Sequence, residues 1–226
     1  MRLLKILMIT AFVICIRTDV HSQKLLFTEF TYGQFVKHTD NDLDITNEKN
    51  LKDSFGSTIG FQFNIKHSHS ILLQIGYHRS VTEKATSFLN YVMDPLGNDY
   101  FVEKPIDLSF HAVPVDIQYA WSMHRYVNIC IGPSFTGNIR KITVHYIDYY
   151  LKEKEFIDRL FGIGAGIAGS IQLSIPLSHG KRYCFISSMG FRYVKSLWFD
   201  AEGRELDDYG LSYSQFQIST GIGIRL

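Results

Sequence analysis

The sequence predicts an all-β fold, an eight-stranded antiparallel up-and-down transmembrane β-barrel. Three observations predict it: apolar and polar residues alternate in eight segments, short and long connections alternate between these segments, and a short basic and then apolar stretch opens the chain. A period of two places successive side chains on opposite faces of a strand. Segments of about 9 to 15 residues are long enough to cross the hydrocarbon layer as tilted strands.

The opening stretch has the layout of a secretory signal peptide. Met1–Lys5 is basic, Ile6–Ile16 is apolar, and Val20–Ser22 offers a cleavage point before Gln23. The apolar run is too short to span a bilayer comfortably as a helix. We therefore expect residues 1–22 to be a signal peptide and residues 23–226 to form one outer-membrane barrel domain.

Charge and cysteine content exclude some classes of partner and structure. Removal of the leader, which holds Arg2, Lys5, Arg17 and Asp19, moves the formal net charge from +1 to −1. A chain with so little net charge has no expected nucleic-acid partner. The two remaining cysteines, Cys130 and Cys184, are too few for a disulfide framework, so we expect free, packed thiols.

Four predicted strands lie in the amino-terminal part of the barrel domain. They are Leu25–Val36, Ser57–Lys66, Ser70–Val81 and Leu108–Trp121. The second and third alternate cleanly, with Leu72 as the exception in the third. Pro114 lies inside the fourth, where proline cannot donate to the ladder, so it predicts a bulge or a strand end.

Four more predicted strands follow. They are Tyr126–Lys141, Phe161–Ile175, Tyr183–Val194 and Ser214–Leu226. Pro133 predicts a second bulge or strand end. In the last strand one face is apolar at five positions, formed by Phe216, Ile218, Ile222, Ile224 and Leu226.

The connections fall into two classes. Three are short, namely His67–His69, Ser122–Arg125 and Leu177–Arg182. Four are long and rich in acidic residues and turn formers, namely Lys37–Gly56, Thr82–Asp107, Ile142–Asp158 and Lys195–Tyr213. This layout is typical of an outer-membrane barrel with periplasmic turns and four extracellular loops, and an even strand number lets the sheet close without edges.

The two faces of the strands predict what lies outside and inside the barrel. The apolar faces are large and aromatic, so we expect them to contact outer-membrane lipid, with interfacial girdles formed by Tyr77, Tyr119, Trp121, Tyr126, Tyr183 and Trp198. The opposite faces predict a polar network that fills the lumen, formed by Glu29, Lys66, His78, Asp116, Arg140, Arg192 and Arg225. Eight strands leave no room for a wide channel, so diffusive pore function is not expected.

Three stretches carry a resemblance to a known family: Ala112–Tyr119 (AVPVDIQY), Ile129–Phe135 (ICIGPSF) and Gly221–Leu226 (GIGIRL). Together with the leader, they make the chain resemble the PorT-like outer-membrane barrels common in Bacteroidetes. The resemblance implies insertion by the barrel-assembly machinery, which would read the apolar face of the last strand. That signal usually ends in an aromatic residue, and Leu226 departs from it. The loops would bind an extracellular ligand or a secretion-system partner that the sequence does not identify.

Motifs that suggest cofactor or metal binding lack the context they need. Gly164–Gly169 has the letters of a dinucleotide fingerprint but continues as an alternating strand, so its glycines are expected to make room for bulky neighbours in the lumen. Asp40–Asp44 begins like a calcium loop, yet Ile45 and Leu51 occupy the glycine and glutamate positions. A looser cation site in this acidic loop stays open. No cofactor is expected.

The histidines give no stronger indication of metal binding or catalysis. His67 and His69 lie in a predicted tight turn without a third ligand nearby in sequence, which favours a plain turn. His78 and Ser80 are spaced as a base and a nucleophile, but no G-x-S-x-G elbow is present. We therefore expect no catalytic residues.

The resulting hypothesis is a non-enzymatic outer-membrane barrel with a structural or surface-binding role. The alternative is a secreted soluble lipocalin-like barrel that binds a small apolar ligand, with its apolar faces turned inward. A lipid-modifying acyl hydrolase built on Ser80 is a third hypothesis.

Overall fold

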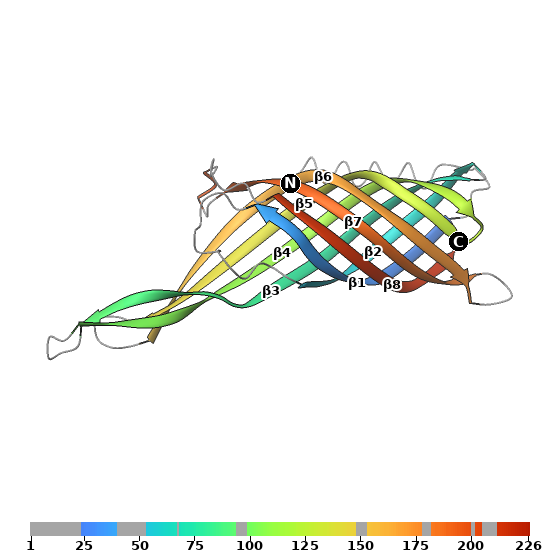
Figure 1. Ribbon diagram of the computed structural model, residues 1–226. Helices are drawn as coiled ribbons and strands as arrows, with labels where there is room; N and C mark the ends of the chain where they lie inside the picture. Colours follow the sequence, from blue (N-terminus) through green and yellow to red (C-terminus); the bar gives the residue numbers. More distant parts are fainter. Residues whose placement is uncertain are drawn as a thin grey trace.

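The computed structural model is a closed antiparallel barrel of eight strands, which confirms the predicted fold class (Figure 1). It describes residues 24–39, 53–66, 68–93, 99–147, 153–177, 182–199, 202–204 and 212–226. The predicted signal peptide, Asp40–Asp44 and His67 lie outside the described residues. Among the described residues, no helix is long and apolar enough to cross a bilayer.

The strands follow one another around the barrel in chain order. They are β1 (Lys24–Thr39), β2 (Asp53–Lys66), β3 (His69–Met93), β4 (Asp99–His124), β5 (Val127–Ile147), β6 (Glu153–Pro176), β7 (Tyr183–Phe199) and β8 (Ser212–Arg225). The barrel closes between β1 and β8, whose ladder runs from Leu25 opposite Arg225 to Thr39 opposite Ser212. Every described strand therefore has a partner on both sides for at least part of its length.

The strands extend much farther at the end of the long connections than the sequence predicted. The ranges Thr82–Asp107 and Ile142–Asp158 were predicted as loops, but β3 and β4 pair from Val92 opposite Tyr100 down into the barrel, and β5 and β6 pair up to Ile147 opposite Glu153. Figure 1 shows the β3–β4 hairpin reaching well beyond the barrel body. Aromatic and β-branched residues populate these segments and favour extended backbone, which outweighs their charged residues.

The opposite end of the barrel is compact. Backbone hydrogen bonds brace its short turns, with Ser122 N donating to Ser68 O at 2.9 Å and Ser174 N donating to Tyr126 O at 2.8 Å. Leu226 N also donates to Lys24 O at 2.8 Å, across the seam between the last and first strands. We call this the short-turn end and the other the long-strand end.

The prediction of bulges or strand ends at the two prolines was wrong. Thr136 lies opposite Pro114 and Ile167 lies opposite Pro133, without a register shift at either position. Each proline forfeits one ladder hydrogen bond but leaves the strand continuous, because the surrounding ladder holds its backbone extended. The observed register shifts fall elsewhere, for example between Asn64 and Lys66.

Candidate functional site

The outer surface of the barrel is apolar on all eight strands. Large apolar side chains with more than a third of their surface exposed recur at alternate positions, up to 76% for Phe30 and 67% for Ile163. The interleaved positions point inward and are buried. Soluble monomers do not expose apolar surface of this extent, so the barrel spans a membrane and the soluble lipocalin-like alternative is excluded.

Most of the predicted girdle residues lie on this outer surface. Tyr77, Tyr119, Trp121 and Tyr183 are each close to half exposed. The prediction for Trp198 was wrong, because only 2% of its surface is exposed and it points into the lumen. A tryptophan near a strand end is compatible with either the outer girdle or the lumen. Trp198 belongs to the lumen because it alternates in step with the inward residues Val194 and Ser196.

The centre of the lumen holds a buried ion pair. Arg192 Nη2 on β7 lies 2.5 Å from Asp116 Oδ2 on β4, with both side chains almost fully buried. Arg192 Nη1 also donates to Gln217 Oε1 on β8 at 3.1 Å. The strands β4, β7 and β8 are thereby linked across the interior. Charges taken out of water need such partners, so the pair is consistent with a lumen filled by side chains.

Three other members of the predicted lumen network are also buried. Glu29 is buried and accepts a hydrogen bond from Ser188 Oγ at 3.2 Å. His78 is buried too, and neither ring nitrogen has a hydrogen-bond partner among the described residues. Arg140 is buried farther toward the long-strand end.

The two remaining members lie at the short-turn end. Lys66 is exposed rather than part of a buried network, because it is the last residue of β2 and lies at the rim just after a register shift. Arg225, near the end of β8, is only half-buried. Both residues fall on the lumen side by parity, but parity does not tell how far along the barrel a residue lies.

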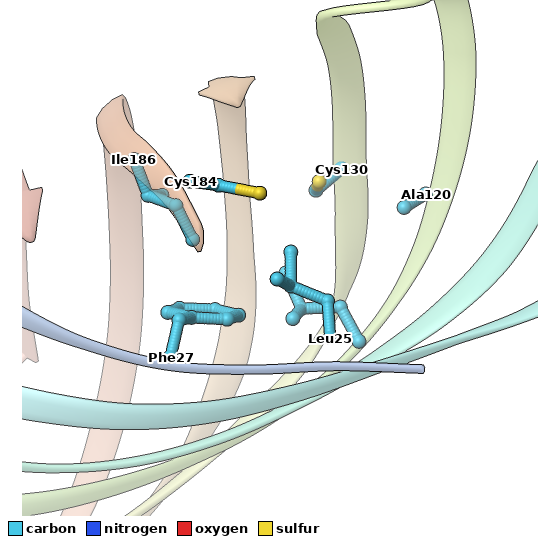
Figure 2. Packing of buried hydrophobic residues seen from close by; sticks show 7 residues of the cluster. Leu25, Phe27, Ala120, Cys130, Cys184 and Ile186 are labelled. Atoms are coloured by element: carbon cyan, nitrogen blue, oxygen red, sulfur yellow. The ribbon is translucent and has the colours of Figure 1, made fainter. Parts of the chain in front are cut away.

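The lumen is not filled by polar side chains alone. A basal apolar layer closes it near the short-turn end, formed by Leu25, Phe27, Leu72, Ala120, Cys130, Cys184 and Ile186. Figure 2 shows the labelled side chains pointing from β1, β4, β5 and β7 into one space. Both cysteines are free and buried, as predicted. The sequence indicates this layer through runs of consecutive apolar residues, such as Leu25–Phe27 and Ile71–Leu73, because at least one member of each run must face inward.

An aromatic layer closes the lumen toward the long-strand end. The ring of Phe110 lies 5.6 Å from that of Tyr213 in an edge-on arrangement and 6.3 Å from that of Trp198. All three side chains are buried. The polar centre therefore lies between two layers of buried apolar and aromatic side chains.

A pocket of about 350 Å³ opens below the basal apolar layer, at the short-turn end. We call it the basal pocket. It is lined by Lys24, Leu25, Gln62, Asn64, Ser122, Met123, His124, Arg125, Tyr126, Asn128, Ser174 and Arg225. Of these residues, the sequence predicted only Arg225 as a lumen residue and Tyr126 as a girdle residue, because the lining comes together only when the barrel closes.

Among the described residues, the motifs that could suggest catalysis or nucleotide binding lack the geometry they need. Ser80 Oγ donates to the backbone oxygen of Asp53 at 2.6 Å, so it is not hydrogen-bonded to His78. Gly164–Gly169 lies inside β6 and lacks the following helix that a nucleotide fingerprint needs. In the described ranges, no three His, Cys, Asp or Glu side chains are grouped to hold a metal ion.

The chain was compared with known proteins. No family model matches it, and no curated protein matches its sequence. Among solved structures it is similar to the outer membrane protein OprG from Pseudomonas aeruginosa, with 10% identity, a TM-score of 0.49, and coverage of 91% of this chain and 96% of that one. It is also similar to Ail, the attachment invasion locus protein of Yersinia pestis, with 11% identity, a TM-score of 0.41, and coverage of 91% and 100%. Neisserial surface protein A has 11% identity, a TM-score of 0.40, and coverage of 90% and 97%.

Proposed function

We propose that this protein is a small, non-enzymatic outer-membrane barrel with a structural or surface-binding role at its long-strand end. The observation that carries the proposal is a lumen with buried apolar layers on both sides of its polar centre, in a barrel whose wall continues beyond the body on one side. A closed lumen leaves the outer rim as the available working surface. The PorT-like motifs in β4, β5 and β8 agree with this proposal.

The prolonged wall suits a polypeptide partner. The described β2–β3 ladder reaches only to Ser54 opposite Ser80, whereas β3 continues to Met93. The described β4–β5 ladder likewise ends at Ile106 opposite Val144, whereas β4 begins at Asp99. Beyond these points the hairpin presents two strand edges, and extended peptides bind such edges through main-chain hydrogen bonds.

Labelling of intact cells tests the location and orientation. A cysteine replacing Arg204, an exposed residue of the β7–β8 connection, should react with a membrane-impermeant maleimide. A cysteine replacing His124, exposed at the short-turn end, should react only after the envelope is opened. Native Cys130 and Cys184 are buried and should add little background. If only His124→Cys were labelled in intact cells, the orientation would be opposite to the proposed one. Equal labelling of both cysteine variants would contradict membrane insertion.

Conductance measurements test the closed lumen. In planar bilayers the unmodified protein should give no stable conductance steps. A variant trimmed in both apolar layers, Phe27→Ala with Leu72→Ala, Phe110→Ala and Trp198→Ala, should conduct, because it removes four large buried side chains of these layers. Steady conductance of the unmodified protein would refute the proposal that the lumen is closed.

We further propose that the barrel-assembly machinery inserts the chain through β8. The proposal is supported by the outward side of this strand, where Phe216, Ile218, Ile222 and Leu226 are exposed and Ile224 is half-buried. Leu226→Phe should raise the fraction of folded protein in the membrane, measured by heat-modifiable gel mobility. Leu226→Asp should lower it. Equal yields from all three chains would argue against recognition of the last residue.

A further inference from the structure

The basal pocket collects positive charge. Four of its twelve lining residues, Lys24, His124, Arg125 and Arg225, are basic, and none is acidic. They come from β1, from the end of β4, from the β4–β5 turn and from β8, so they converge from different sides of the mouth. A pocket lined by cations without carboxylates favours an anionic ligand.

The short connections around the pocket carry no acidic residue. The short connections His67–His69, Ser122–Arg125 and Leu177–Arg182 contain histidines, lysine and arginines but no Asp or Glu. Within the strands, the carboxylates nearest this end belong to Glu29 and Asp116, which lie in the lumen and bond to Ser188 and Arg192. The positive charge of the mouth is therefore not neutralised by acidic side chains of the short turns.

Several lining groups are suitably placed for a polar ligand. The guanidinium of Arg125 lies over the ring of Tyr126, 4.5 Å from its centroid, which limits its movement. Gln62 and Ser174 are only 6% and 7% exposed, and Gln62 Oε1 and Ser174 Oγ have no hydrogen-bond partner within the described part of the chain. A hydroxyl donor and an amide acceptor therefore accompany the cations.

We propose that the basal pocket binds a phosphate ester of about the size of a lipid headgroup. Guanidinium and ammonium groups from the β1–β8 seam and from the β4–β5 turn match the anionic non-bridging oxygens of a phosphate ester. The amide oxygen of Gln62 would accept from a hydroxyl group on the ester. A volume of about 350 Å³ suits a small ligand rather than a polymer. The proposal concerns the end opposite to the proposed surface-binding role and is independent of it.

Titration of the purified protein tests the proposal. In zwitterionic detergent, glycerol 3-phosphate should bind, as measured by calorimetry and phosphorus NMR, whereas glycerol should not. The double variant Arg125→Gln with Arg225→Gln should weaken binding at least tenfold, because it removes two charge-assisted contacts. Arg225→Lys should retain most of the affinity. Arg79→Gln is the matched control, since Arg79 is exposed on the outer face of β3.

A second experiment distinguishes two sources of the phosphate ester, a lipid headgroup and a free soluble ester. Phosphatidylglycerol mixed into the micelles should compete with glycerol 3-phosphate if the pocket takes a lipid headgroup, and phosphatidylcholine is the comparison. Competition supports a lipid source, and binding of the soluble ester without competition supports a free ester. Absence of binding by either probe to protein of normal heat-modifiable mobility would overturn the proposal. So would binding that is unchanged in the Arg125→Gln, Arg225→Gln variant.

Discussion

Asp116 and Arg192 form the most consequential contact between two side chains in the lumen. Their ion pair is enclosed by protein and, farther out, by the apolar outer surface. Desolvation of the two charges offsets much of their attraction, so the pair contributes little net stability relative to apolar residues of similar size. Loss of one partner is a different matter, since the other charge then stays buried and uncompensated.

We therefore expect Asp116→Ala to lower the free energy of unfolding by about 3–5 kcal/mol. Urea unfolding in micelles, followed by heat-modifiable mobility, measures it. Asp116→Leu combined with Arg192→Met should recover most of the loss. The control is Glu202→Ala, which breaks an ion pair whose side chains are each 72% exposed and should have little effect. A double variant as unstable as Asp116→Ala would contradict this account.

Ile171 tests the environment of the outer face. It is exposed on β6 between Ile167 and Ile175, well inside the apolar run. In lipid, Ile171→Lys should cost about 2–4 kcal/mol. Ile157→Lys is the matched control, because it lies on the same strand beyond Phe161, where the described β6–β7 ladder begins. Stability in phospholipid bilayers measures both. Equal effects of the two substitutions would speak against a lipid-facing belt at Ile171.

At the scale of the strand, glycines set how closely neighbouring chains approach. A methyl group on Gly166 in β6 would lie 1.8 Å from the backbone oxygen of Tyr193 in β7. A methyl group on Gly137 in β5 would meet nothing within 4 Å. Gly166 thus allows close strand contact, whereas Gly162 and Gly164 make room for the side chains of Trp198 and Val194.

Gly166→Ala should therefore destabilise the barrel by roughly 1–3 kcal/mol, because the β6–β7 ladder must shift to admit the methyl group. Gly137→Ala should be neutral or slightly stabilising. Urea midpoints of the two single variants, measured side by side in micelles, make the comparison. A neutral Gly166→Ala would mean that the two strands separate without cost.

The sequence predicted the number and order of the strands and which of their faces points inward. It did not predict where the strands end or how far along the barrel axis each residue lies. Alternation is a local signal, and it correctly places Glu29 and Asp116 on the lumen side. Strand extension past Val81 depends on pairing between β3 and β4, which no single segment reveals. The places of Lys66 and Trp198 along the barrel depend on stagger and register between strands. The basal pocket forms only when the barrel closes, so no sequence motif predicts it.

At the scale of the whole molecule, charge is separated along the barrel axis. The short connections carry basic residues and no acidic ones, while the long connections carry most of the acidic residues. The ion pair of Asp116 and Arg192 lies between the two apolar layers and is isolated from both rims. The short-turn end therefore attracts anionic partners, and the long-strand end attracts cationic ones.

The seam between β1 and β8 affects the order of folding. All other ladders join strands that follow one another in the chain, whereas the seam joins residues such as Thr31 and Ser219, whose hydroxyl oxygens are 2.9 Å apart although 188 positions separate them. Closing so long a segment costs on the order of 2–3 kcal/mol more than closing a hairpin. The seam should form last and open first. Hydrogen exchange should be faster for its amides than for those between β5 and β6, and equal protection would show that the barrel opens only as a unit.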